Sequence, residues 1–403
     1  MTPIWFDPAA LTVSCGTETA ALLAQEYALL KYLYDRRGQV FSREQLLDRV
    51  WPDRYPDERT VDDHIYRIRR KLARLPQLAV VTVRGCGYCL RLTEAAAAPN
   101  PSVMDEEIRA SVQGLFRKYH LLGQGRSMLT LAAQQDALGI EVDAFYAVFL
   151  HFIQGDLAWL LRTDEVPPEH RLYWVLLYYS LTADAQASLA MFERALKLDV
   201  LPPEQKRELY ILNIVDLYAD TGRTAQAEAR IAVARDVVER DGLTGFAMPV
   251  ALAELYVRIV KDDLAAAAQS MEALERMLAE APYLRELGRF HALRAMLLLR
   301  SGRMKEAAQA ADMGLHVLRQ SQNVPLALMS VRQLLRCLDR PPVGAPPGQA
   351  DGGKRDARRT ALKRKLEAER AELDREYGLE RLLGEMRAML DRNLRSGENK
   401  GID

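Results

Sequence analysis

A glycine or aspartate followed by an alanine recurs every 40 residues through the middle of the chain, and this spacing constrains the fold most strongly. The anchors of the repeat are Gly222, Asp262 and Gly302, and the alanines five residues later are Ala227, Ala267 and Ala307. A small residue at a fixed point of a helix allows a paired helix to approach closely. Stacked helical hairpins bury together the apolar faces that no single hairpin can bury alone. The repeat therefore predicts an all-α stack.

Two breaks in composition divide the chain. Residues 95–101 (AAAAPNP) interrupt the periodicity, and residues 341–353 are rich in Pro and Gly, as linkers are. We therefore predict domains at 1–95 and 104–340, a linker at 341–354, and a charged amphipathic helix at 355–395. This last helix could mediate dimerisation, contact DNA, dock on the repeats or stand in solvent, and its sequence favours none of these roles.

Residues 1–95 mix strand and helix signals. Short apolar segments precede a helical pattern from Tyr27 to Tyr34, and Ser42 with Gln45 forms a capping-box signature for a second helix. A third helix is expected from about residue 58 to residue 74. Two β-prone runs around a Gly-x-Gly turn then predict a hairpin. This is the order of a winged helix, so the predicted fold class is mainly α, with an N-terminal α+β winged helix and an all-α superhelix.

Charge is distributed unevenly, although the chain carries 55 basic and 55 acidic side chains. The net charge is +2 over residues 1–95, −5 over residues 96–353 and +3 over residues 354–403. Between Arg59 and Arg91, eight basic and two acidic residues give a local charge of +6. A basic helix beside a basic hairpin suits a helix in the major groove and a wing in the minor groove. Charge alone is equally typical of a solvated face.

The order of residues from Gly38 to Tyr88 is more specific, and it resembles the OmpR/PhoB-type winged-helix DNA-binding domain over residues 4–92. The segments that carry the resemblance are GQVFSREQLL at 38–47, Trp51, ERTVDDHI at 58–65, IRRKL at 68–72 and TVRGCGY at 82–88. The resemblance implies double-stranded DNA as a partner, with base contacts from Arg67 and its neighbours Asp63 and Tyr66. It implies phosphate and wing contacts, which fix register, from Arg43, Trp51, Arg59, His64, Arg69 and Arg84. Arg70 and Tyr88 complete the predicted DNA-contacting set.

The chain departs from the family pattern at several positions. Position 63 is commonly small or apolar in this family and position 66 is often basic. Asp63 is able to accept a hydrogen bond from cytosine N4, so we do not expect the operator of another member to apply. Leu23 stands where a helix-opening Thr is usual. The family's receiver domain has no counterpart before the winged helix, so control by receiver phosphorylation is not expected within this chain.

The repeat resembles tetratricopeptide repeats, although its 40-residue unit is longer than the usual length of about 34. FERALKLD at 192–199 is the closest local match, and Ser188 continues the pattern upstream. Such domains bind peptides or proteins on a concave face. A DNA-binding head on helical repeats resembles peptide-sensing quorum regulators of the RRNPP type and receiver-less OmpR-type activators. The former usually carry a different helix-turn-helix.

Polar residues within otherwise apolar helices are candidates for lining the groove. An Asn can hold a ligand backbone through its donor and its acceptor, and an Arg can clamp a carboxylate. The candidates are Asn213, Asp216, Glu254, Arg258, His291 and Arg294. For any one of them, an inter-helix hydrogen bond or a solvent-facing position is the simpler expectation.

No motif predicts catalysis, a metal or a cofactor. The four cysteines (Cys15, Cys86, Cys89 and Cys337) are too few for a disulfide scaffold. The CxxC at 86–89 lacks the second ligand pair of a zinc site, so it is either incidental or a redox switch. The start lacks a signal peptide, and the longest apolar run, residues 173–179, is far shorter than the ~20 residues of a membrane helix. We expect a cytoplasmic protein without enzymatic activity or a membrane partner.

Together these features predict a bacterial, sequence-specific transcriptional regulator that forms a homodimer. Its repeats would sense a peptide, small molecule or protein, and RNA polymerase is a further expected partner. The alternative is an interaction scaffold whose repeats bind proteins, with constitutive or no regulation of DNA. A steep fall in DNA affinity with salt would separate the two.

Overall fold

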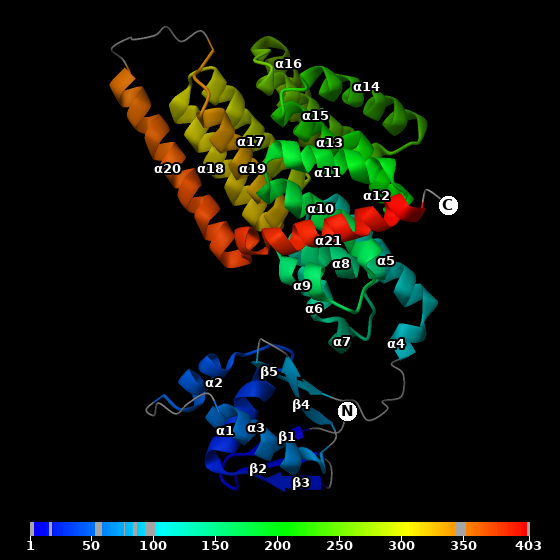
Figure 1. Cartoon of the computed structure of the whole chain (residues 1–403), viewed down its shortest axis with the longest axis vertical. Coiled ribbons are helices and arrows are strands. Elements are labelled where there is room, and N and C mark those ends of the chain that lie inside the picture. The colour runs from blue at the N-terminus through cyan, green and yellow to red at the C-terminus, as the bar shows by residue number, and fades with distance from the viewer. Residues whose placement is uncertain are drawn as a thin grey trace. The chain divides into compact units, whose positions relative to one another are not determined.

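The computed structural model describes residues 4–15, 18–52, 59–75, 77–83, 87–92, 101–343 and 352–400 (Figure 1). The chain divides into an N-terminal unit of residues 1–104 and a helical unit of residues 105–403. The division lies after the predicted break at residues 95–101, and the predicted domain bounds stay a prediction.

The N-terminal unit has the predicted order of strands and helices. Its elements are β1 (Ile4–Asp7), β2 (Thr12–Cys15), β3 (Glu18–Ala21), α1 (Ala24–Asp35), α2 (Arg43–Val50), α3 (Arg59–Leu72), β4 (Leu78–Val83), β5 (Gly87–Leu92) and α4 (Pro101–Met104). The strands β1, β2 and β3 form an antiparallel sheet, and β4 and β5 form the hairpin. A bridge between Phe41 and Tyr88 ties the segment before α2 to that hairpin.

Two helix starts in this unit show how local sequence sets the boundaries. The Ser42 side chain accepts from the backbone N–H of Gln45 at 3.1 Å, and the Gln45 side chain accepts from the Ser42 N–H at 2.9 Å, which is the predicted capping box. At α1, Leu23 offers no capping oxygen. There the Glu26 carboxylate accepts from the Leu23 N–H at 2.8 Å, so the helix still begins at Ala24.

The helical unit opens with five helices that the repeat pattern did not anticipate. These are α5 (Glu106–Leu121), α6 (Gly125–Ala133), α7 (Gln135–Leu138), α8 (Ala144–Ile153) and α9 (Leu157–Arg162). Aromatic side chains of α8 pack on α10 (Pro168–Thr182), as in the edge-on contact of Phe152 with Tyr178 at 5.2 Å between ring centroids. Alternating aromatic and aliphatic residues of this kind give no 40-residue signal.

Four helical hairpins follow, and the turns of the last three fall at the repeat anchors. The pairs are α10 (Pro168–Thr182) with α11 (Ala185–Lys197), α12 (Pro203–Glu208) to α13 (Ile214–Asp220) with α14 (Thr224–Arg240), α15 (Ala247–Val260) with α16 (Leu264–Glu280), and α17 (Leu284–Arg300) with α18 (Met304–Ser321). Gly222, Asp262 and Gly302 have φ values of +77°, +63° and +74°. The left-handed conformation ends each first helix.

The repeated small residues lie where the paired helices approach. Ala227, Ala267 and Ala307 are fully buried, at 0% exposure. The contact is closest between α17 and α18, where a Cβ added to Gly314 would lie 3.0 Å from the Gly288 carbonyl oxygen. A short π-helical segment, η1 (Leu209–Asn213), joins α12 to α13.

The C-terminal segment differs from the predicted linker and single helix. After α19 (Val324–Leu338), a helix α20 already begins at Gly352 and ends at Tyr377, and a second helix, α21, spans Leu379–Lys400. The break lies at Gly378, whose φ of +64° favours glycine. Both helices dock on the repeats, the third of the four roles that the sequence left open. Figure 1 shows α21 crossing the unit near α9, α10 and α11.

The docking of α21 is both apolar and ionic. Leu382, Met386 and Leu390 are at most 1% exposed. Arg162 of α9 donates to both carboxylate oxygens of Glu385, at 2.7 and 3.0 Å. Arg194 of α11 donates to both carboxylate oxygens of Glu398, at 2.6 and 3.0 Å, and to Asp391 Oδ1 at 3.1 Å.

Candidate nucleic-acid interface

Helix α3 presents two different faces. Its buried side consists of apolar residues at most 4% exposed, namely Val61, Ile65, Ile68 and Leu72. Its opposite side, which we name the outer face of α3, consists of four exposed residues, Asp63, Tyr66, Arg67 and Arg70. Tyr66 is 62% exposed, a high value for an aromatic side chain. The predicted base-facing residues therefore lie together and are open to solvent.

The outer face contains charges with no partner among the residues that the structure describes. Neither Asp63 nor Arg67 has a hydrogen bond or an ion pair to any residue that the structure describes. Arg70 lies 6.0 Å from the centroid of the Tyr66 ring, one turn away. Such groups are available to a ligand that offers both acceptors and donors.

A network of three polar side chains that are buried at least in part ties α3 to α2 and to the hairpin. Arg43 Nε donates to Asp62 Oδ1 at 2.7 Å, and the Tyr88 hydroxyl donates to the same oxygen at 2.6 Å. Partial burial opposes ionisation of Asp62, but the Tyr88 hydroxyl and the Arg43 guanidinium outweigh it and hold its pKa below the usual value. Asp62 was not among the predicted site residues. It positions its neighbours rather than facing outward.

The remaining predicted DNA-contacting residues differ in how much of each side chain is exposed. Arg69 donates from Nε to the Val80 carbonyl at 2.9 Å and from Nη2 to Thr82 Oγ1 at 2.7 Å, so it joins α3 to β4 while staying exposed. Trp51 is 5% exposed and meets the ring of His64 edge-on at 5.0 Å.

Tyr88 is also 5% exposed, and Arg59 is exposed at the start of α3. Arg84 and Cys86 lie outside the described residues. The DNA-contacting role of the whole set stays a prediction, and for Trp51 and Tyr88 the side chains are mostly engaged in packing.

The predicted effector residues of the repeats are largely engaged with other helices. Asn213 Nδ2 donates to the Tyr173 hydroxyl at 2.8 Å. Asp216 Oδ2 accepts from Arg289 at 2.7 Å and from Gln333 at 2.9 Å. These contacts join α10, α13, α17 and α19 across the inside of the stack, as the simpler interpretation expected.

Of the other four candidates, Glu254 and Arg258 are paired within the helical unit, and His291 and Arg294 lie on α17. Glu254 pairs with Arg258 at 2.6 Å and with Arg235 of α14, and Arg258 Nη1 also donates to the Ala266 carbonyl at 3.1 Å. His291 is half-buried, and burial together with the Arg294 charge lowers its pKa. Arg294 is exposed, 3.9 Å from Glu275. Of the six predicted residues, Arg294 is exposed and the other five are partly buried.

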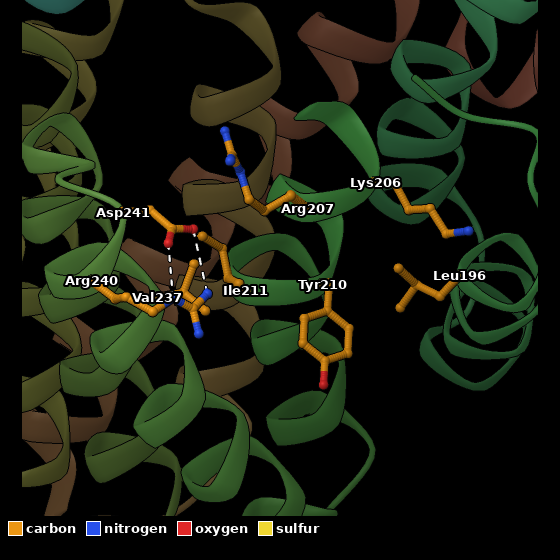
Figure 2. Close-up of a pocket in the computed structure, with 8 residues that line it drawn as sticks. All are labelled: Leu196, Lys206, Arg207, Tyr210, Ile211, Val237, Arg240 and Asp241. Atoms are coloured by element: carbon orange, nitrogen blue, oxygen red, sulfur yellow. Dashed lines mark hydrogen bonds and ion pairs between the residues drawn. The ribbon is translucent and has the colours of Figure 1, made fainter. Parts of the chain in front are cut away.

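A surface pocket of about 310 Å³ lies between α11, the η1 segment and α14 (Figure 2). Apolar side chains and cations line it together, namely Leu196, Lys206, Arg207, Tyr210, Ile211, Val237, Arg240 and Asp241. Figure 2 shows the Arg240 guanidinium directed at Asp241, with 2.9 Å between Nε and Oδ1. None of the six predicted effector residues lines this pocket. Its lining comes from three segments that no motif connects, which is why sequence reasoning missed it.

Within the described ranges, no group of three or more His, Cys, Asp or Glu side chains is arranged to hold a metal ion. Cys15, Cys89 and Cys337 are buried. None of the described helices combines the length and the apolar character required to cross a membrane.

Residues 16–90 match the family model described as "Transcriptional regulatory protein, C terminal". The N-terminal unit is therefore a winged-helix domain of the OmpR/PhoB type. This winged-helix domain is 50% identical over 74 residues to the uncharacterized transcriptional regulatory protein YclJ of Bacillus subtilis, a match covering 18% of this chain and 33% of that protein. It is 52% identical over 68 residues to the phosphate regulon transcriptional regulatory protein PhoB of Rhizobium meliloti, covering 16% and 30%.

A solved structure, the DNA binding domain of CpxR from E. coli, is 32% identical and is covered over 95% of its length by 23% of this chain, with a TM-score of 0.21. The chain spans only about a third of the length of the curated relatives that it matches. The helical unit lies outside the matched segment.

Proposed function

We propose that this protein is a sequence-specific, DNA-binding transcriptional regulator that acts in the cytoplasm. The outer face of α3 carries the proposal, because Arg67 and Asp63 present donors and an acceptor that no described residue pairs with. The Arg43–Asp62–Tyr88 network ties this helix to α2 and the hairpin. Base edges in the major groove offer matching acceptors and donors. Relatives of the winged helix are described as transcriptional regulators, which supports the same assignment.

The experiment compares the full chain with Arg67→Ala and with Arg276→Ala as the matched control. Arg276 is an exposed arginine of α16, in the helical unit and outside the winged helix. After selection of a preferred duplex from a randomised library, we expect Arg67→Ala to lose about 1–3 kcal/mol of discrimination, roughly 5- to 150-fold, while the control binds like the parent chain. Equal selectivity of both variants would reject the assignment. A flat dependence of affinity on salt would favour the scaffold alternative.

The helical unit, in this proposal, is a tetratricopeptide-like stack that senses a peptide, small molecule or protein and supports a homodimer. The recurrence of buried alanines and left-handed turns at the 40-residue spacing supports the comparison. Because Asn213, Asp216, Glu254 and Arg258 are engaged internally, an effector at the inner face must compete with those contacts. Native mass spectrometry of protein purified from its own host would report a co-purifying ligand and the oligomeric state together.

A further inference from the structure

Helix α5 carries apolar residues that the chain leaves uncovered. Eight large apolar side chains stand exposed in the described part of the helical unit, and half of them lie between α5 and the start of α8. These four are Ile108, Leu115, Leu138 and Phe145. Exposed apolar residues gathered in one region mark a protein contact more often than scattered ones do.

The apolar residues of α5 form one stripe along the helix. Ile108, Val112, Leu115 and Tyr119 follow one another at spacings of four, three and four residues, which places them on a single face. Ile108 and Leu115 are 38% and 39% exposed, and Val112 and Tyr119 are partly buried. The stripe thus runs along α5 from its exposed N-terminal half to its packed C-terminal half.

The N-terminal half of α5 has almost no packing against the described residues of the helical unit. All residues from 106 to 111 are exposed, whereas Phe116 is 1% exposed and its ring stacks on Tyr146 at 5.2 Å between centroids. Helical turns without tertiary packing are only marginally stable in water. A partner on the stripe would supply the missing contact.

The charges beside the stripe indicate which partner fits. Glu107 and Lys118 lie on the same flank of α5, about three helical turns apart. Neither has a hydrogen bond or an ion pair to any described residue. When two copies of one helix pack antiparallel, like flanks face each other, so Glu107 of each copy meets Lys118 of the other. The two-fold axis then passes close to Val112, at the centre of the stripe.

We propose that α5 is a homodimer contact, occupied by α5 of a second copy in antiparallel orientation. This proposal rests on the proposed function, because a regulator that binds DNA as a dimer reads two half-sites. One helical stripe is smaller than the roughly 1,200–2,000 Å² of a stable interface, so we expect a dissociation constant in the micromolar range. Two reading heads on one duplex would strengthen it through effective concentration.

The test uses the full chain in sedimentation velocity without DNA, over a concentration series from about 1 to about 200 µM, which brackets the expected range. We expect reversible dimerisation that Glu107→Lys and Lys118→Glu each weaken about tenfold, because two attractive contacts become repulsive. The double variant restores both pairs and should recover the parent dissociation constant. Lys305→Glu, an exposed charge reversal on α18, is the control and should change nothing.

Two results would overturn the proposal. One is a chain that stays monomeric over the whole series, which would mean that another segment or another protein covers the stripe. The other is a dimer that the single variants leave unchanged or that the double variant fails to restore. Retention on a DNA half-site, measured in parallel with Arg67→Ala, separates this failure from failure of the DNA-binding function, because self-association without DNA does not involve α3.

Discussion

Replacing Asp63 by Asn should change which base the winged helix selects. Asp63 is the single acid on the outer face of α3, and it lacks a partner among the described residues. A carboxylate in the major groove accepts from cytosine N4, whereas an Asn side chain donates and accepts, which suits adenine N7 and N6. Asp63→Asn keeps the size of the side chain and removes no internal contact. We therefore expect stability to change by less than about 0.5 kcal/mol.

The magnitude follows from two competing effects. Exchange of one base contact is worth about 1–3 kcal/mol of discrimination, or roughly 5- to 150-fold. Loss of the negative charge also relieves repulsion by phosphates, but at about 10 Å in water that energy is only ~0.4 kcal/mol per phosphate before screening by salt. The change in base preference should thus exceed the general gain in affinity. Arg67 lies one turn away, about 5.4 Å along the axis, so its own preferred base should stay the same.

The assay selects duplexes from one randomised library with the parent chain and with Asp63→Asn, followed by competition between the two selected sequences. We expect one position to change from cytosine to adenine while the position read by Arg67 remains constant. If both proteins select the same sequence, Asp63 does not read a base. If the Arg67 position changes instead, Asp63 serves to orient that arginine.

Three further predictions concern the helical unit. The Asp220 side chain is 1% exposed and pairs with two arginines of α19. Asp220→Asn should therefore lower the free energy of unfolding of the protein by about 3–5 kcal/mol, measured by urea denaturation. Burial, and to a lesser degree the Arg285 charge, lower the pKa of His120 to about 3. Below about pH 6.5 the imidazole is therefore protonated in the unfolded chain but neutral in the folded one, so the protein loses stability as the pH decreases. His120→Phe should reduce the stability difference between about pH 7 and about pH 5 by about 2 kcal/mol; an unchanged difference would show that the imidazole titrates normally. Ala267→Leu should cost at least about 1–3 kcal/mol through overpacking, whereas Ala265→Leu on the exposed side should cost less than about 0.5 kcal/mol, and equal costs would contradict the buried position of Ala267.

Local sequence predicted the elements whose boundaries depend on local chemistry. The capping box at Ser42 and the apolar stripe of α3 required no knowledge of distant residues, and the structure confirms both. The repeat anchors are similar, because Gly222 and Gly302 adopt the positive φ that ends a helix.

Contacts between distant residues were not predictable in the same way. Asp216 stood out as a polar residue in an apolar helix, but its partner Arg289 lies 73 residues along the chain. A groove-lining residue and an internally paired one look alike in sequence, since both are polar positions on an apolar helix. The break at Gly378 was missed for a related reason: a single glycine in a charged helical pattern is tolerated unless the following segment has a surface to dock on.

The path of α20 and α21 has a consequence for how the stack can respond to a ligand. In an open stack, each repeat contacts only its neighbours, and the stability of the stack is close to a sum of nearest-neighbour contributions. Here α20 packs along α18 and α19, while α21 returns to α9 and α11 through Arg162–Glu385 and Arg194–Glu398. Gly155 leaves space for the ring of Tyr377, because a Cβ there would lie 2.4 Å from it. The first and last hairpins are thereby joined, and movement of one hairpin against the next must strain the contacts of α21. A ligand bound to one hairpin would therefore strain the helical unit as a whole rather than that hairpin alone.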